Sequence, residues 1–359
     1  MIREELAARN LPELFRMRDG STVTAENWPA RRAELLDLLS SEEYGYTPEA
    51  PESVRVTVEK RDDKAFEGKA FQETIRVAFD TPNGEFSFPF ELVVPYSDKK
   101  VPLFVQINFR PEVPDKYQPT EEILDNGFAI ASFWYLDVTS DDAMDGDYDP
   151  EADEHRFRNW FRDGIAWMYP RDEATGWGKI GMWAFAASRV LDALWDRPEI
   201  DRERVAVCGH SRLGKTALWC AAQDERFAMA ISNDSGCSGA AITREKRGER
   251  IAEITRNYPY WLCGKYRAYC NLEDETPFDQ HFLVAAIAPR AVYIGSAMED
   301  DWADPQSEFL CAAAASDVWE MLGKTGFVTP DEIPTGDCIL DDGTVAYQVR
   351  PGTHFFSRA

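Results

Sequence analysis

A serine at the junction of a buried strand and a helix is the first residue whose surroundings favour chemistry. Ser211 stands in the segment Val205-Ala-Val-Cys-Gly-His-Ser-Arg-Leu-Gly-Lys215, where an apolar run typical of a buried strand leads directly into a helical pattern. A serine at such a turn holds its hydroxyl above the sheet, at the positive end of the helix, which suits a nucleophile. Gly209 and Gly214 permit the close approach of the two elements. The spacing is G-x-S-x-x-G rather than the usual G-x-S-x-G, so a serine that caps an ordinary helix explains the motif equally well.

A serine nucleophile needs a base, and the chain has only four histidines. His354 follows the last predicted strand, which is where the base of an α/β-hydrolase lies, and the order serine, acid, histidine is respected. His210 adjoins the serine, and we expect it to pack at the turn with its side chain pointing elsewhere. His281 begins an apolar helical run and is expected to be structural, whereas His155 follows an acidic stretch and is expected to face solvent. His354 is therefore the candidate base.

The imidazole of such a base is oriented by a carboxylate, and two aspartates follow predicted strands in suitable places. Asp234 comes after the run 227–232. Asp300 follows the run 291–296, which is the more usual position of the acid in α/β-hydrolases. Both aspartates remain candidates on this reasoning.

The sequence pattern predicts that the elements positioning these residues include a sheet with two kinds of strand. Near the N-terminus, three runs alternate between apolar and polar residues, as antiparallel strands do. From residue 103 onward the runs are short and apolar, the first two of them suited to strands buried on both faces, and helical patterns follow. The alternating runs are 54–58, 71–79 and 86–94; the apolar runs are 103–109, 128–135, 205–208, 227–232, 291–296 and 345–349; the helical runs are 180–195 and 213–222. This order predicts an α/β fold with a mostly parallel central sheet covered by helices.

We expect a single domain over residues 1–359, with antiparallel strands leading into the parallel sheet. Residues 1–50 read as a polar, helical N-terminal segment. Residues 240–280 interrupt the alternation with an aromatic and charged insertion. In an α/β sheet such an insertion lies beyond the C-terminal ends of the strands, where ligands bind, so we expect it near the active site.

Six short segments in order resemble one family of esterases. They are Gly-His-Ser-Arg-Leu-Gly-Lys215, Ser235-Gly-Cys-Ser-Gly-Ala-Ala241, Asp279-Gln-His281, Ala288-Pro-Arg290, Asp301-Trp-Ala-Asp-Pro305 and Gly352-Thr-His354. Together they resemble the bacterial form of the glucuronoyl esterases, carbohydrate esterase family fifteen, over roughly residue 102 to the C-terminus. The resemblance implies an α/β-hydrolase fold and hydrolysis of esters of 4-O-methyl-glucuronate, such as those that link glucuronoxylan to lignin alcohols. It implies no metal and no cofactor.

The resemblance also implies roles for named residues. Ser211 matches the nucleophile, His354 the general base and Arg212 the arginine that stabilises the oxyanion. A guanidinium beside the nucleophile would supply a fixed positive charge where the oxyanion develops. The residues that match sugar contacts of the family are Lys215, Glu249 and Trp302.

The family's acid occupies two positions, and this chain has an aspartate at each. Some members carry it where Asp234 stands, commonly as glutamate, and some bacterial members carry it where Asp300 stands. Since aspartate is one methylene shorter than glutamate, Asp234 is expected to reach the imidazole poorly, and we predict a role shared by the two. The chain departs from the family in the charged, proline-rich segment Asn108-Phe-Arg-Pro-Glu-Val-Pro114 and in ending at Ala359, where the family continues into a final helix. We expect either one less covered face of the core or a longer parent chain.

Composition excludes several other classes of function. The chain has 39 Lys and Arg against 64 Asp and Glu, a net charge of −25, whereas nucleic-acid binding needs a basic surface. No run of 18 apolar residues predicts a membrane span. No C-x-x-C pair or G-x-G-x-x-G motif favours a zinc, redox or dinucleotide site. The acidic segment Asp145-Gly-Asp-Tyr-Asp-Pro-Glu151 resembles a calcium loop, but Pro150 stands where that loop needs glycine.

The interpretation that follows is a serine carboxyl-ester hydrolase whose substrate is a uronate ester of xylan-derived saccharides. One alternative is an acetyl-xylan or other carbohydrate acetyl esterase, and another is a non-catalytic carbohydrate-binding relative. The seven cysteines are scattered through the chain, and the acidic N-terminus is followed by no apolar segment of a secretory signal. Both features favour the cytoplasm, unless a signal peptide is missing from this chain. The sequence predicts neither the natural alcohol nor the oligomeric state.

Overall fold

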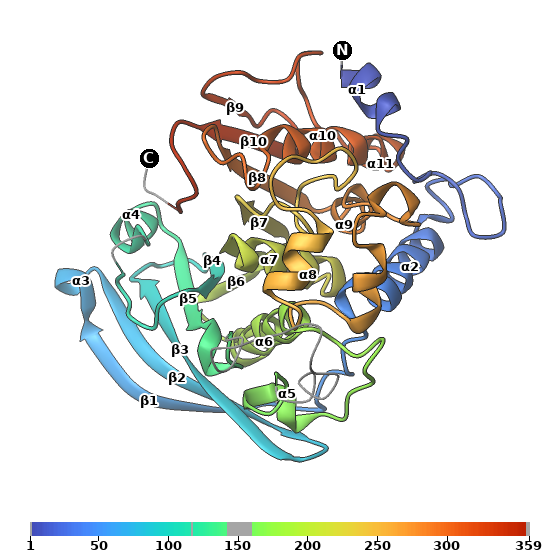
Figure 1. Cartoon of the computed structure of the whole chain (residues 1–359). Coiled ribbons are helices and arrows are strands. Elements are labelled where there is room, and N and C mark those ends of the chain that lie inside the picture. The colour runs from blue at the N-terminus through green and yellow to red at the C-terminus, as the bar shows by residue number, and fades with distance from the viewer. Residues whose placement is uncertain (1, 116–117, 142–159, 357–359) are drawn as a thin grey trace.

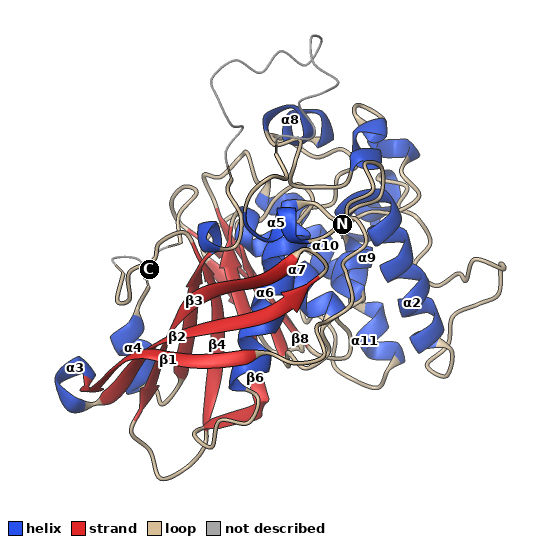
Figure 2. Ribbon diagram, turned by 90° about the horizontal axis from the view of Figure 1, so that it is seen from below, coloured by secondary structure: helices blue, strands red, loops and turns tan. Residues whose placement is uncertain are grey.

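The computed structural model describes residues 2–115, 118–141 and 160–356, and the fold is built around one ten-stranded sheet in the order β1-β2-β3-β5-β4-β6-β7-β8-β10-β9 (Figures 1 and 2). Six central strands run parallel to one another. They are β5 (Ala129–Trp134), β4 (Val101–Asn108), β6 (Ile200–His210), β7 (Met229–Asn233), β8 (Ala291–Ala297) and β10 (Val345–Arg350). The predicted mixed α/β sheet of an α/β-hydrolase is thus confirmed.

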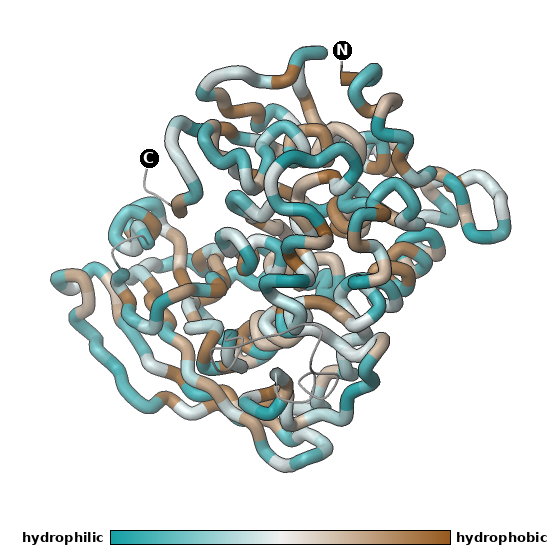
Figure 3. Tube along the Cα trace, viewed as in Figure 1, coloured by the Kyte–Doolittle hydropathy of each residue, from teal (hydrophilic) through white to brown (hydrophobic). Residues whose placement is uncertain are grey.

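The antiparallel strands lie at the two edges of the sheet. On one side β1 (Arg55–Lys64), β2 (Ala70–Thr81) and β3 (Gly84–Pro95) form a meander that joins β5, and on the other side the short β9 (Cys338–Leu340) pairs with β10. In β2 and β3, buried and half-buried residues alternate, as the period-two pattern predicts. The alternation over 54–58 correctly predicted an antiparallel strand, but every residue of β1 is exposed, including Val56 and Val58, and much of the strand is hydrophilic (Figure 3). β1 is the edge strand and pairs with β2 alone, so it has no core side.

The helices that position the site gather on one face of the sheet. Helix α6 (Lys179–Leu194) packs on β2 and β4, α7 (Arg212–Gln223) on β6 and β7, and α10 (Pro305–Ala315) on β8 and β10. Helix α9 (His281–Ala285) joins this layer between α7 and α10. Nearly every residue of α6 is buried, because this helix is enclosed by the sheet, by α7 and by the loops above it.

The opposite face is covered less completely. Helix α4 (Thr120–Asp125) covers β3 and β5 there, over a small separate apolar cluster that includes Val93 and Ile130. Further along the sheet Met229, Ile231 and Tyr293 are only half-buried on this face, whereas their neighbours Ala230 and Val292 on the helix side are fully buried. The expectation of a less covered face therefore agrees with the structure.

The N-terminal segment is helical only in part. Helix α1 (Ile2–Ala8) and helix α2 (Trp28–Leu39), with its extension Ser40–Tyr44, are separated by a long loop, so the uniformly helical segment 1–50 is wrong. Turns interrupt the helix because side chains there bond to the backbone: Asp19 accepts from the N–H of Ser21 at 2.9 Å, and Asn27 Oδ1 accepts from the N–H of Thr24 at 2.7 Å. Among the described residues, no helix has the length and apolar character to span a bilayer.

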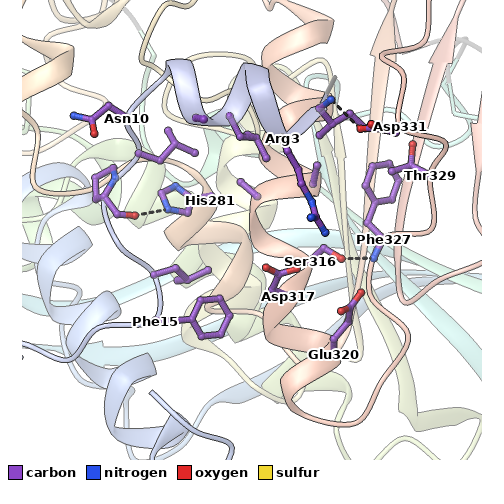
Figure 4. Close-up of a pocket in the computed structure, with 18 residues that line it drawn as sticks. Arg3, Asn10, Phe15, His281, Ser316, Asp317, Glu320, Phe327, Thr329 and Asp331 are labelled. Carbon is purple, nitrogen blue, oxygen red and sulfur yellow. Dashed lines mark hydrogen bonds between the residues drawn. The ribbon is translucent and has the colours of Figure 1, made fainter. Parts of the chain in front are cut away.

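A cleft of about 980 Å³ lies between α1 and the helices α10 and α11 (Asp317–Met321), and Figure 4 shows Arg3 extending into it. None of the residues predicted for chemistry lines this cleft. A smaller cavity of about 130 Å³ lies at the C-terminal ends of β4 and β6, lined by Asn108, Phe109, His210 and Phe356 among others. That end of the sheet carries the candidate site.

Candidate active site

Ser211 stands alone between β6 and α7 in a strained turn. Its backbone has φ 58° and ψ −126°, a region that residues other than glycine rarely adopt and that costs about 1–3 kcal/mol. Its N–H donates to the carbonyl of Asn233 at 2.8 Å, which ties the turn to the end of β7. A Cβ at Gly209 would lie 2.1 Å from the carbonyl oxygen of Leu213, so glycine is required for the strand and helix to meet this closely. The predicted strand-to-helix turn is confirmed.

His354 joins the serine to one of the two candidate acids. Its Nε2 lies 2.9 Å from Ser211 Oγ, and its Nδ1 lies 2.6 Å from Asp300 Oδ2. With Nδ1–H donating to the carboxylate, Nε2 is left to accept the serine proton. Burial of Asp300 would raise the pKa of its carboxyl group, but the hydrogen bond and charge of His354 outweigh it and hold that pKa below its ordinary value. The arrangement is that of a nucleophile, a base and an orienting acid.

Asp234 lies close to this group but has other partners. Donor and acceptor atoms of Asp234, Asp300 and His354 all lie within 4.8 Å of one another. The Asp234 carboxylate accepts from Asn233 Nδ2 at 2.8 Å and from Arg350 Nη2 at 3.1 Å, and among the described residues no hydrogen bond joins it to His354. Burial and the neighbouring charge of Asp300 raise its pKa to about 7. Both predicted acids are therefore at the imidazole, and Asp300 makes the hydrogen bond.

The ligand atoms of these three residues also lie close enough together to bind a metal ion. Both imidazole nitrogens of His354 already face hydrogen-bonding partners, Asp300 and Ser211, so a metal ion would have to displace one of them. The geometry fits a proton relay better than a metal centre. The calcium-like segment 145–151 and His155 lie outside the described residues.

His210 packs against the base, which the sequence did not predict. Its ring centroid lies 4.7 Å from that of His354, and its other face stacks on Phe356 at 6.0 Å. Asn233 Nδ2 donates to His210 Nδ1 at 2.9 Å. Burial and the nearby His354 lower the pKa of His210 to about 3, so it stays neutral. The expectation that it packs at the turn is confirmed, but its side chain points to the site. His281, as predicted, is structural: it is buried, with Nε2 3.1 Å from the carbonyl oxygen of Pro12.

Arg212 occupies the other side of the serine, in a setting made by the insertion. Its guanidinium pairs with Asp141 and lies over the rings of Trp261 at 4.5 Å and Tyr258 at 5.1 Å, which stack on each other at 3.7 Å. Asp141 also accepts from Trp261 Nε1 at 2.7 Å. Burial alone would lower the pKa of Arg212, but Asp141 more than offsets it and raises that pKa. A cation at a helix N-terminus opposes the helix dipole, and Asp141 is the partner that stabilises it there.

The three residues predicted to bind sugar come from separate segments and are linked by hydrogen bonds or charge. Lys215 and Glu249 are both nearly buried, with Lys215 Nζ 3.7 Å from Glu249 Oε2 and donating to the carbonyl of Ser235. Trp302 is 50% exposed, and its carbonyl accepts from the N–H of Glu249 at 3.1 Å. The N–H of Lys215 bonds to the carbonyl of Ser211 at 3.2 Å, so Lys215 lies one helical turn after Ser211.

Comparisons with known proteins indicate one family of enzymes. Residues 151–323 match the family model described as glucuronyl esterase, fungi. Carbohydrate esterase MZ0003, from an unknown prokaryotic organism, is 33% identical over 96% of this chain and 85% of its own length. A 4-O-methyl-glucuronoyl methylesterase of Schizophyllum commune is 28% identical over 87% of this chain and 74% of its own.

Solved structures agree with these sequences. The glucuronoyl esterase from Solibacter usitatus superposes with a TM-score of 0.85 at 32% identity, over 97% of this chain and 94% of that one. A promiscuous CE15 esterase from a marine bacterial metagenome superposes with a TM-score of 0.84 at 30% identity, over 97% and 93%. With the serine, histidine and aspartate joined as described, the chain belongs to the glucuronoyl esterases of carbohydrate esterase family 15.

Proposed function

We propose that this chain hydrolyses esters of glucuronate, or of its 4-O-methyl ether, on xylan-derived saccharides, with Ser211 as the nucleophile. The observation that carries this proposal is the hydrogen-bonded series from Ser211 Oγ through His354 to Asp300, in a member of this family. Binding alone needs no serine strained at a helix N-terminus and no oriented base.

The reaction begins when His354 Nε2 takes the proton of Ser211 and Oγ attacks the ester carbonyl. Asp300 stabilises the imidazolium that forms, since its carboxylate accepts from Nδ1. When the tetrahedral intermediate collapses, the C–O bond to the alcohol breaks and His354 returns the proton to the leaving oxygen. A water molecule, activated by the same imidazole, then attacks the acyl-enzyme and releases the uronate and the free serine.

Arg212 is the proposed source of charge stabilisation. Its guanidinium is half-buried, fully protonated and held by Asp141 and Trp261 before substrate binds. A fixed charge of this kind costs no reorganisation as the oxyanion develops, which is why preorganised donors are effective. The N–H of Arg212, the first of helix α7, is directed away from the helix body and is a second donor available to the oxyanion.

Substrate recognition is proposed for the pair Lys215–Glu249 and for Trp302. Hydroxyl groups of a uronate ring need fixed donors and acceptors, and the buried ion pair supplies both. The half-exposed indole of Trp302 offers an apolar face on which a sugar ring can stack. An acetyl group has no hydroxyls to meet these residues, so they favour a uronate over an acetate as acyl group.

The test compares benzyl glucuronate with acetylated xylo-oligosaccharides and nitrophenyl acetate as substrates. We expect kcat/KM for the glucuronate ester to exceed that for the acetates. Hydrolysis of acetates alone would contradict the proposal and favour a carbohydrate acetyl esterase. Labelling by a fluorophosphonate, blocked in Ser211→Ala, separates any esterase from a non-catalytic carbohydrate-binding relative.

The compartment remains a prediction. All seven cysteines are free thiols and five of them are buried, a pattern typical of a reducing environment such as the cytoplasm. The substrate would then be an imported oligosaccharide. A signal peptide in the parent gene would overturn this.

A further inference from the structure

Arg350 ends β10, and its guanidinium bonds to the loop that carries the base. Nη1 donates to the carbonyl of Pro351 at 3.2 Å. Nη2 donates to the carbonyl of Thr353 at 3.2 Å and to that of Phe355. Since Thr353 and Phe355 are the two chain neighbours of His354, one guanidinium holds the backbone on both sides of the base.

The loop has few other means of keeping its shape. Residues 351–356 belong to no helix or strand, and most of them are exposed; the imidazole of His354 is itself 40% exposed. Among the described residues, the other hydrogen bonds to the backbone of this loop run from the N–H of Glu299 to the carbonyl of Gly352 at 2.9 Å, from the N–H of Phe355 to the carbonyl of Thr353 at 2.8 Å, and from Asn233 Nδ2 to the carbonyl of Phe355 at 3.4 Å. A loop that buries little apolar surface depends on hydrogen bonds for its order.

Asp234 anchors the guanidinium in turn. Its Oδ2 lies 3.1 Å from Arg350 Nη2, and the side chains are 0% and 10% exposed, respectively. A buried guanidinium needs such a counter-charge, and an uncompensated one is strongly destabilising. The N–H of Asp234 bonds to the carbonyl of Gly295 at 2.7 Å, so the anchor rests on β8. The connection runs from the sheet through Asp234 and Arg350 to the histidine loop.

We propose that Arg350 is a positioning residue: together with Asp234 it holds residues 351–355 so that His354 faces Ser211 with one nitrogen and Asp300 with the other. The proposal rests on the proposed function, because it concerns the base of that reaction. Reacting groups must be held to within about 0.5 Å, and a displacement of about 1 Å costs roughly 100-fold in rate. The arginine would therefore act on turnover without touching the substrate.

The experiment uses Arg350→Met, Arg350→Lys and a matched control, Arg32→Met. Arg32 also binds two carbonyls, those of Ala222 and Ala286, and one carboxylate, that of Glu225, but at the far end of α7 from Ser211. Active sites are counted by fluorophosphonate titration, and kcat for benzyl glucuronate is expressed per titrated site. We expect about 100-fold lower kcat in Arg350→Met with KM within about threefold, a smaller loss in Arg350→Lys, and an unchanged kcat in Arg32→Met. Lysine keeps a charge for Asp234 but lacks the fork that reaches three carbonyls.

A purely structural role would give fewer titratable sites with normal kcat per site, and that result would overturn the proposal. A second readout is the downfield proton resonance of the bond between His354 Nδ1 and Asp300. It should be present in wild type and in Arg32→Met and be shifted or lost in Arg350→Met; an unchanged resonance would also overturn the proposal. If wild type hydrolyses no glucuronate ester, the proposed function fails, while the fluorophosphonate labelling rate and this resonance still decide the role of Arg350.

Discussion

The two sides of Ser211 are built in different ways. On one side His354 stands on an exposed loop after β10; it donates a hydrogen bond to Asp300, and Arg350 donates to the backbone carbonyl of the neighbouring Thr353. On the other side Arg212 is half-buried against Asp141 and two stacked rings of the insertion. The base must accept and return protons and admit water, so it stays at the surface. The charge proposed to stabilise the oxyanion gains strength from partial burial, because interactions between charges are screened less there.

The largest effect is expected for Ser211, which lies between His354 and Arg212. Ser211→Ala removes the proposed nucleophile, so kcat for benzyl glucuronate should fall by on the order of 10⁶, with thermal stability nearly unchanged because alanine keeps the same backbone turn. Steady-state kinetics and circular dichroism check both. A variant that keeps more than a hundredth of wild-type kcat would show that the chemistry lies elsewhere.

The acids are the next test of the proton-transfer side. Asp300→Asn removes the charge that stabilises the imidazolium, so we expect kcat to fall by about 10²–10⁴. Asp234→Asn should lower kcat less, by about tenfold, and the double variant should be far worse than either. Pre-steady-state measurement of acylation gives the comparison. Abolition of turnover by one substitution, with no effect of the other, would disprove the shared role and identify the single acid.

Substitutions at Arg212 test the side of Ser211 that faces Asp141 and the insertion. Arg212→Met should lower kcat by about 10²–10³ with a small change in KM, because a preorganised oxyanion donor acts in the transition state. Asp141→Asn keeps the arginine and removes its partner, so its loss of kcat should be smaller. Equal losses in the two variants would mean that Asp141, and not the guanidinium, carries the effect.

The sugar contacts should affect binding more than turnover. Trp302→Ala removes a half-exposed stacking surface, so KM for a glucuronate ester on a xylo-oligosaccharide should rise about three- to tenfold, while nitrophenyl acetate is hydrolysed as before. The ratio of KM values for the two substrates is the measurement. A parallel change for both substrates would point to a structural role for the indole.

A smaller effect concerns stability and pH. Burial raises the pKa of Glu308 to about 8, although Gly236 and Ser296 donate hydrogen bonds to its carboxylate at 2.8 and 2.5 Å. Since this pKa exceeds that of the unfolded chain, near 4, the folded state holds the proton more tightly and loses stability as pH rises from about 4 to 8. Melting temperatures should therefore fall over that range, and less steeply in Glu308→Gln. An equal slope in both proteins would exclude Glu308 as the cause.

How well the sequence predicted a feature depended on how far apart in the chain the residues that form it lie. The turn at Ser211 and the strands beside it depend on local patterns, and His354 and Asp300 became candidates because each follows a predicted strand. The partners that complete the site come from distant segments: Asp141 is separated from Arg212 by 71 residues, and Arg350 from Asp234 by 116. No local pattern could show that these residues pair. The side chain of His210 faces the site because β6 and the loop after β10 meet in space, which a local pattern does not show either. The strand β1 was predicted but its exposure was not, since alternation shows a strand and not what covers it.

Release of benzyl alcohol from benzyl glucuronate by the wild-type chain and by Ser211→Ala, followed together with the mass of the quenched protein, tests the central claim most directly. The account predicts turnover in wild type, a glucuronoyl adduct on Ser211 at early times, and neither in the variant. Turnover of acetates alone, or an adduct on a residue other than Ser211, would contradict it.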